Sequence, residues 1–201
     1  DHRQATAGDL GFIVGPRLNA AGRLDDMSIG IECLLADSSA SARGFAEKLH
    51  QLNRERRDIE QSMQQDALAQ LQSIDLENDA SLFAMTLYDP AWHQGVIGIL
   101  ASRIRERVHR PTLVFADADE GMLKGSGRSI AGLHLRDVLD QVATQHPGLL
   151  TKFGGHAMAA GLSLAKDDLD RFKQALNDAV AEALGHIPPE RTEESDGTLA
   201  S

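Results

Sequence analysis

The sequence has 201 residues, of which 42% are hydrophobic and 25% charged, which is typical of a soluble globular protein. No apolar run approaches the roughly 20 residues of a membrane-spanning helix, so we expect no membrane contact. The formal net charge of −10 argues against a protein that coats nucleic acid broadly but permits a local basic groove. Cys33 is the only cysteine, so an internal disulfide and a cysteine-based zinc site are excluded, and a cytoplasmic location is expected.

The first part of the chain contains an apolar run that we expect to end at Gly15-Pro16. A cationic segment follows, in which Arg17 and Arg23 flank small residues and Asn19. Small residues permit close approach, and guanidinium groups suit a phosphate backbone. The pattern alone favours the alternative, a surface loop with solvated charges.

Residues 39–73 are predicted to form one long helix, because apolar residues recur at three- and four-residue steps without a proline. Such a helix spans roughly 50 Å at 1.5 Å per residue. Its charged middle, 54–58, is expected to be exposed, as in a connector between two regions. The positions expected to pack against the two flanking regions are Phe45, Leu49, Met63 and Leu71.

From residue 81 the pattern alternates between strands and helices, which predicts an α/β fold. The predicted strands are 82–88, 111–116, 122–130 and 158–164, and the predicted helices are 96–108, 133–144 and a last helix that runs to residue 183 or 184. Asp167 or Asp168 is expected to cap the last helix, and Gly185 to end it. Earlier in the chain, Ser28 is expected to cap a short helix over 29–35.

Two glycine-rich stretches, 124–129 and 152–164, carry groups that suit an anion. Bare N–H groups of a Gly-Ser turn and the guanidinium of Arg128 could together hold a phosphate. We expect the two stretches to face each other around such a ligand; two ordinary tight turns are an equally good interpretation. Arg128 could instead pair with an acid such as Asp137 and hold the domain together. The candidate ligand-binding residues are Ser126, Gly127, Arg128, Ser129, Gly154, Gly155 and His156.

A Trp-His-Gln-Gly turn, 92–95, precedes the predicted helix 96–108 and places side-chain donors near the positive end of that helix. A lone Trp more often packs in a core, and a lone His more often has a structural role. No acids and histidines have convincing metal-ligand spacing, and no Ser-His-Asp arrangement can be argued from their order. The residues therefore predict neither a catalytic group nor a metal site in this chain.

Four segments, 15–23, 92–103, 125–129 and 153–161, follow one another in an order and spacing that cover nearly the whole chain. Together they resemble the RecJ family, the single-stranded-DNA-specific 5′→3′ exonucleases of the DHH phosphoesterase superfamily. The resemblance implies a DHH-associated α/β domain with a central mixed sheet, joined by a long helix to the C-terminal part of a DHH domain. The implied divisions are the end of the DHH domain at 1–38, the connecting helix at 39–73, the DHH-associated domain at 74–187 and an acidic linker toward a missing oligonucleotide-binding domain at 188–201.

The resemblance also implies a function, the substrate-binding part of an exonuclease of DNA recombination and repair, with single-stranded DNA as the partner. Arg17, Asn19, Arg23 and His93 would join the glycine-rich stretches in holding the strand and its 5′ phosphate. Two alternatives stay open: a stand-alone nucleic-acid-binding module, or part of a DHH-family phosphodiesterase for oligonucleotides or cyclic dinucleotides.

RecJ proteins cut with a cluster of aspartates and histidines, including an Asp-His-His motif, that holds manganese or magnesium. This chain lacks that motif, and Asp1-His2-Arg3 has the wrong third residue. We therefore expect the chain to bind no metal and to leave a 5′-labelled single strand intact. Manganese-dependent digestion by clean protein would contradict this expectation.

Overall fold

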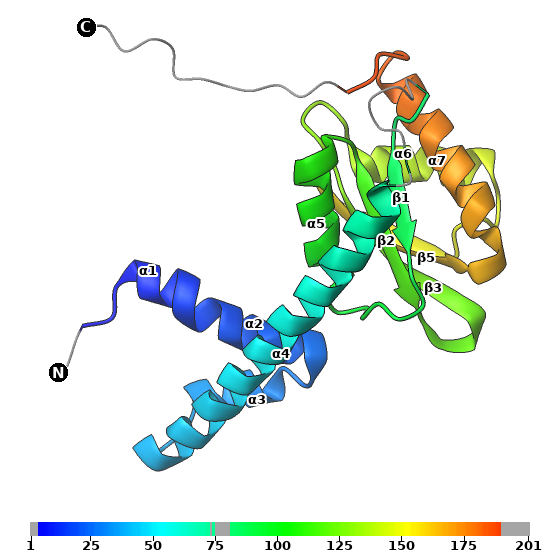
Figure 1. The fold of residues 1–201 in the computed structure, drawn as a ribbon. Helices are drawn as coiled ribbons and strands as arrows, with labels where there is room; N and C mark the ends of the chain where they lie inside the picture. The colour runs from blue at the N-terminus through cyan, green and yellow to red at the C-terminus, as the bar shows by residue number, and fades with distance from the viewer. Residues whose placement is uncertain (1–3, 73, 75–80, 190–201) are drawn as a thin grey trace, which may run out of the picture.

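A computed structural model of the chain describes residues 4–72, 74 and 81–189. Its central element is the helix α4 (Ser39–Gln72), which carries the helices α2 (Gly15–Leu24) and α3 (Ser28–Leu34) beside its first half and an α/β domain beside its second half (Figure 1). The predicted long helix is thus confirmed as far as Gln72. Its last predicted residue, the Asp1-His2-Arg3 segment, most of the predicted loop after the helix, and 190–201 of the predicted acidic linker lie outside the described residues.

The N-terminal elements are helical throughout, and they are α1 (Ala7–Asp9), the π-helical turn η1 (Leu10–Val14), α2 (Gly15–Leu24) and α3 (Ser28–Leu34). The apolar run ends at Gly15-Pro16 as predicted, where η1 passes directly into α2. Proline is tolerated in the first turn of α2 because its missing N–H has no intrahelical partner there. The surface-loop interpretation of the following segment is wrong, because Ala20 and Ala21 are fully buried in a core that α2 shares with α4.

Two helix ends differ in their capping from what the pattern predicts. Ser28 begins α3 but does not cap it; its N–H donates to Oδ1 of Asp26 at 2.9 Å, and this bond lowers the pKa of Asp26. Asp168 precedes α7 (Leu169–Ala183), but its side chain makes no capping hydrogen bond. Gly185 ends α7 as predicted, at a φ of +63° that suits glycine.

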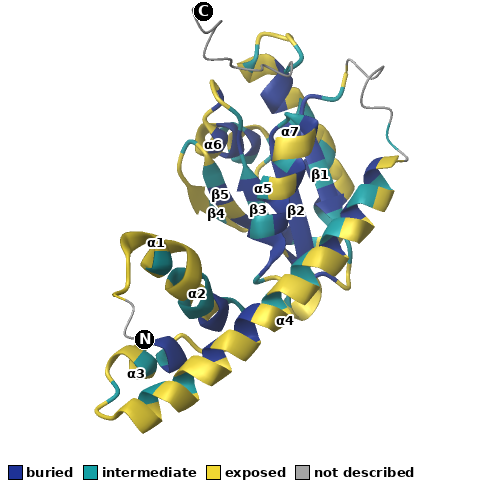
Figure 2. Ribbon diagram, turned by 60° about the vertical axis from the view of Figure 1, so that its left-hand side comes forward, coloured by how far each residue is buried: buried dark blue, intermediate teal, exposed yellow. Residues whose placement is uncertain are grey.

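The two halves of α4 pack into two separate cores (Figure 2). Leu49 contacts the N-terminal core, where Phe45 is partly buried, and Met63 and Leu71 contact the α/β core, as predicted. The segment 54–58 between them is exposed, except for Arg56. That side chain is only 13% exposed because it pairs with Glu60 at 2.7 Å across one helical turn. The exposed middle fits the predicted connector.

The α/β domain is a five-stranded mixed sheet between two helical layers, which confirms the predicted fold class. Its elements are β1 (Met85–Tyr88), α5 (Ile97–Val108), β2 (Thr112–Asp117), η2 (Asp119–Gly121), β3 (Met122–Arg128), α6 (Leu135–Gln145), β4 (Lys152–Gly155), β5 (Ala159–Ala165), η3 (Lys166–Asp168) and α7. The strand order is β1-β2-β3-β5-β4, with β1 and β2 parallel and all other neighbours antiparallel. Strand β4 was not predicted.

The helices cover the two faces of the sheet unequally. One core joins the sheet to α6 and α7, and the other joins it to α5 and the second half of α4. On the second face, α5 contacts β2 and β3, while β4 is largely exposed and β5 is exposed at Gly161 and partly exposed at its neighbours on that face. In the described part of the chain, no helix is both long and apolar enough to cross a membrane.

Candidate nucleic-acid interface

Arg128, the last residue of β3, is half-buried, and one of its terminal nitrogens donates to Ser126 Oγ at 3.2 Å and to the Gly127 carbonyl at 2.8 Å. Burial lowers the pKa of Arg128, and the positive charges of Arg23 and Arg105 lower it further. Within the described residues no carboxylate pairs with this guanidinium. A partly desolvated cation that faces two like charges is stabilised by an incoming anion.

The alternative role of Arg128 as a structural partner of Asp137 is wrong. Asp137 lies in the first turn of α6, and its carboxylate contacts Nδ1 of His134 at 3.1 Å. The positive charge of Arg128 is therefore not used to hold α6 to the sheet.

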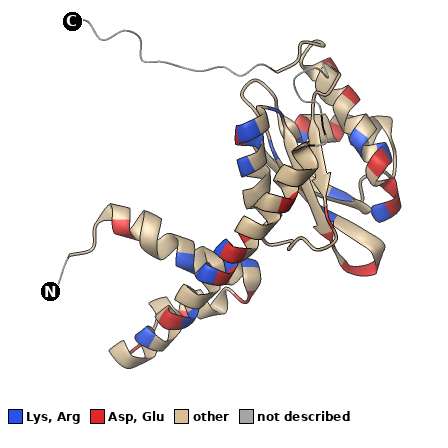
Figure 3. Ribbon diagram, in the orientation of Figure 1, with Lys and Arg blue, Asp and Glu red and all other residues tan. Residues whose placement is uncertain are grey.

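The N-terminal part of α5 lies close to Arg128 because residue 98 is glycine. A Cβ at Gly98 would come within 2.9 Å of Ser126 Oγ and 3.0 Å of Arg128 Nη2. Beside this contact is an open hollow of about 300 Å³, and Figure 3 shows basic residues along α5. The hollow is lined by Gly98, Ile99, Ser102, Arg103, Glu106 and Arg128. A phosphate group therefore has room beside the guanidinium.

Arg23 approaches this site from α2. Its hydrogen-bond partner, Gly95 in the turn before α5, lies 72 residues later in the chain. Its guanidinium donates to the Gly95 carbonyl at 3.1 Å, and the ring of His93 accepts the N–H of Gly95 at 3.0 Å. The turn 92–95 is thus fixed both internally and to α2. His93 has a structural role in this turn, and the turn holds Arg23 near Arg128.

The other two predicted residues of α2 lie elsewhere. Arg17 donates to the Ile13 carbonyl at 2.6 Å and to Nδ1 of His50 on α4 at 3.2 Å. Asn19 is exposed on the same helix. The cations that lower the pKa of Arg128 are Arg23 and Arg105. Arg17 is not one of them, so the structure does not place Arg17 in the group of arginines around Arg128.

The glycine-rich stretch 124–129 is not a turn, and the expected cradle of free N–H groups is wrong. Its residues 124–128 belong to β3, which is hydrogen-bonded to β2 on one side and β5 on the other. Gly127 packs under α6, where a Cβ would lie 2.7 Å from Leu135 Cδ2. Ser129 is buried and its hydroxyl donates to the Leu133 carbonyl at 2.8 Å. Of the four candidate residues in this stretch, only Ser126 and Arg128 face the open side.

The two glycine-rich stretches do not face each other across a ligand, because the second stretch forms β4 and most of β5, and β5 pairs directly with β3. They share one surface instead, since the register places Ser126, Gly161 and Gly154 in one row across the three strands. Gly161, Gly154, Gly155 and the following His156 are exposed. A floor without side chains therefore extends from Ser126 to the edge of the sheet.

The two adjacent glycines of β4 are predicted to differ sharply in their tolerance of alanine. Gly155 has a φ of +146°, and a Cβ there would meet the Ala159 carbonyl and lie 2.5 Å from Ala160 Cα, whereas Gly154 has open space. We expect Gly155→Ala to lower the free energy of unfolding by about 1–3 kcal/mol, and Gly154→Ala to change it by less than about 0.5 kcal/mol. Urea unfolding of both variants measures this, and equal losses would contradict it.

The list of candidate residues omitted several residues of this surface, although four of them lie in the two glycine-rich stretches. The omitted residues are Arg105, Lys124, Lys152, Gly161 and Ser163. The alternation of β3 places Lys124 on the same face as Ser126 and Arg128, so that residue could have been found. The positions of Lys152, Gly161 and Ser163 depend on strand pairing, and that of Arg105 depends on the packing of α5 on β3, which no local pattern reveals. Among the described residues no group of three or more His, Cys, Asp or Glu side chains could hold a metal ion.

Comparison with known proteins gives consistent matches. Residues 79–182 match the family model of the DHHA1 domain. The chain is 56% identical to "Single-stranded-DNA-specific exonuclease RecJ" of Dickeya dadantii over 201 residues and 51% identical to that of Escherichia coli K12 over 200 residues. All of this chain is covered in both cases, but only 35% of each relative, so the chain spans about a third of their length.

Among solved structures, the chain is similar to RecJ from Thermus thermophilus in complex with Mg²⁺. The TM-score is 0.75 at 32% sequence identity, and the match covers 90% of this chain and 27% of that one. An exonuclease RecJ bound to manganese gives a TM-score of 0.72 at 34% identity, covering 88% of this chain and 42% of that one.

Proposed function

We propose, because the chain belongs to the DHHA1 domain family and corresponds to a segment of RecJ, a role in binding substrate. In this proposal the chain is the substrate-binding part of a single-stranded-DNA-specific 5′→3′ exonuclease. Its partner is single-stranded DNA, and the parent enzyme works in DNA recombination and repair. The proposal includes a cytoplasmic location and the division of the chain into 1–38, 39–73, 74–187 and 188–201.

The observation that carries the proposal is the unpaired, half-buried guanidinium of Arg128 beside Arg23 and Arg105. A terminal phosphate carries more negative charge than an internal phosphodiester, roughly −1.5 to −2 against −1. Arg103 and Arg128 line the hollow, and the charges of Arg23 and Arg105 act on Arg128, so the site suits the 5′ end of a strand better than its interior. The planar fork of Arg128 can bind two phosphate oxygens at once, and Ser126 Oγ adds a neighbouring donor.

From this 5′-phosphate pocket the strand crosses the open face of the sheet. Gly161 and Gly154 leave the backbone bare beside Ser126, so the sugar-phosphate chain can approach closely. His156 lies exposed just beyond β4, where its ring can meet the strand. We assign Gly127, Ser129 and His93 to supporting this surface and Arg17 and Asn19 to its outer edge on α2.

The catalytic metal belongs to another part of the parent protein. Relatives of this chain have been solved in complex with Mg²⁺ and with Mn²⁺. The described residues offer no cluster of metal ligands, so this chain's share of the reaction is to bind and orient the strand. A metal ion when bound would activate the water that attacks the phosphodiester.

Competition binding with three ligands tests the proposal. We expect the chain to bind a 5′-phosphorylated oligothymidylate more tightly than the same strand with a 5′ hydroxyl, and both more tightly than a cyclic dinucleotide. A cyclic dinucleotide that binds tightest would favour the alternative, a cyclic-dinucleotide phosphodiesterase. Equal affinity for the 5′-phosphorylated and the 5′-hydroxyl strand would contradict the assignment of a 5′-phosphate pocket.

A further inference from the structure

A second row of polar side chains crosses the open face of the sheet two residues from Ser126. The register aligns Lys124 on β3 with Ser163 on β5, and Ser163 with Lys152 on β4. Two residues along a strand correspond to roughly 6.6–6.8 Å. Because side chains alternate between the faces, this row points to the same side as Ser126 and away from α6 and α7.

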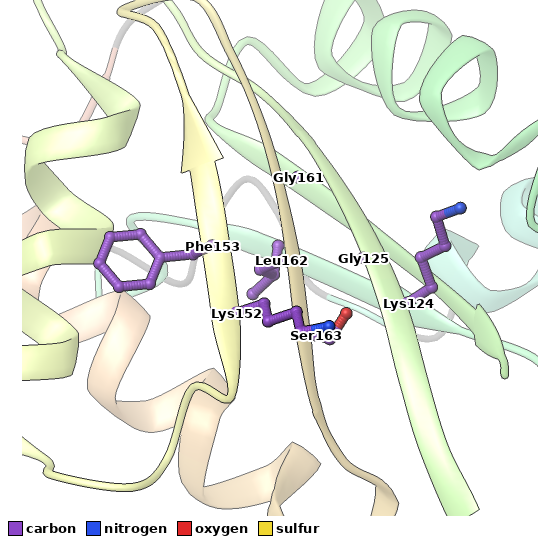
Figure 4. A pocket seen from close by; sticks show the side chains of 7 residues that line it. All are labelled: Lys124, Gly125, Lys152, Phe153, Gly161, Leu162 and Ser163. Atoms are coloured by element: carbon purple, nitrogen blue, oxygen red, sulfur yellow. The ribbon is translucent and has the colours of Figure 1, made fainter. Parts of the chain in front are cut away.

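The row lines an open hollow of about 240 Å³ (Figure 4). Lys124 and Lys152 are exposed, and Ser163 lies between them at intermediate exposure. Within the described residues neither lysine forms an ion pair with an acidic side chain. Two unneutralised ammonium groups around one hydroxyl form a local positive site in a chain whose formal net charge is −10.

The spacing across the sheet suits one phosphate between the two lysines. Strands β3 and β4 are two strand spacings apart, roughly 9–10 Å. Figure 4 shows the Lys152 side chain extending toward Ser163 and the Lys124 side chain extending away from it, and the flexible four-carbon stem of Lys124 allows its ammonium group to turn inward toward a ligand. A group above Ser163 therefore lies within reach of both ammonium groups and of the hydroxyl. The glycine floor continues into this hollow, because Gly161 and Gly125 also line it.

We propose that Lys124, Lys152 and Ser163 form a subsite for an internal phosphodiester of the bound single strand. The inference rests on the proposed function, since the 5′ end of that strand lies in the Arg128 pocket. The lysines contribute point charges that recognise the backbone without regard to base or to the chemistry of the 5′ end. Their contribution should therefore depend on salt and be the same for both kinds of 5′ end.

The double variant K124Q/K152Q tests the subsite in the whole chain. We expect its affinity for oligothymidylate to fall by about three- to tenfold at low salt, because exposed ion pairs are individually weak. The fall should be the same for 5′-phosphorylated and 5′-hydroxyl strands. The slope of log K against log salt should become shallower by about 0.7, the value for one phosphate contact to a single strand.

The matched control is K48Q/K173Q, which removes the exposed Lys48 of α4 and the partly exposed Lys173 of α7, each of which pairs with an aspartate. It changes the net charge equally but should leave the slope unaltered. An unaltered slope in K124Q/K152Q, or the same change in both double variants, would overturn the subsite. Should K124Q/K152Q fail to fold, the amide resonances of Lys124, Lys152 and Ser163 in the wild-type chain decide: they shift with added strand if the subsite exists and stay fixed if it does not.

The two proposals fail in different ways. If the 5′-phosphate pocket is wrong, the wild-type chain shows no preference between the two 5′ ends. If the lysine subsite is wrong, that preference persists while the salt slope is the same in the wild type and in K124Q/K152Q.

Discussion

Replacement of Arg128 by alanine is expected to weaken binding of a 5′-phosphorylated single strand by roughly ten- to a hundredfold, and of a 5′-hydroxyl strand less. Hydrogen bonds to a charged group contribute about 1.5–3 kcal/mol each, and 1.4 kcal/mol corresponds to a factor of ten. The variant also relieves the like-charge contact with Arg23 and Arg105, so it should fold normally. A binding titration with both strands measures the difference.

Two further variants sharpen this test. Arg128→Lys should restore only part of the affinity, because an ammonium lacks the bidentate fork. Arg107→Ala removes an exposed arginine of α5 that does not line the hollow, and it should preserve the preference for the 5′ phosphate. Equal losses of Arg128→Ala on both strands, together with a lowered melting temperature, would show that Arg128 has a structural role.

Gly95→Ala is expected to disrupt the contact between α2 and the α/β domain and to lower the free energy of unfolding by about 1–3 kcal/mol. A Cβ at this position would meet the backbone carbonyl of Arg23 and lie 2.9 Å from its carbonyl carbon. Backbone atoms cannot rotate away, so the end of α2 must shift and the bond from Arg23 to the Gly95 carbonyl must lengthen. Because Arg23 would then lie less firmly beside Arg128, the affinity of Gly95→Ala for the 5′-phosphorylated strand should also fall.

Gly98→Ala is the matched control for this variant. Its Cβ would meet only Ser126 Oγ and Arg128 Nη2, which are the ends of movable side chains. Its stability should therefore be close to that of the wild type, even where its affinity for the strand changes. Urea unfolding of the two variants distinguishes them, and a Gly95→Ala protein as stable as Gly98→Ala would show that the contact is not needed.

Local patterns were sufficient for most of the helices and strands. The three- and four-residue apolar steps of α4 predicted both its length and the residues that pack at its two halves. The alternation in β3 predicted a strand, yet the same glycines were also assigned to an anion-binding turn. A glycine has no side chain to show which face it occupies, so Gly127 under Leu135 was indistinguishable from a glycine that admits a ligand.

Long-range pairing determined what the sequence could not predict. The second glycine-rich stretch forms β4 and most of β5, and β5 pairs with β3, so two stretches expected to face each other are neighbours on one surface. Arg23 approaches Arg128 only because α2 packs on α4 and meets the turn at Gly95. The closeness of Arg23 to Arg128 follows from the tertiary packing of α2, α4 and the turn. It cannot be predicted from the local spacing of residues in the sequence.

The structure of this chain bound to a 5′-phosphorylated tetrathymidylate tests the central claim most directly. We expect the terminal phosphate in the hollow beside Gly98, with its oxygens within hydrogen-bonding distance of the Arg128 guanidinium and of Ser126 Oγ. A terminal phosphate bound elsewhere, with the 3.2 Å bond from Arg128 to Ser126 undisturbed, would contradict the account.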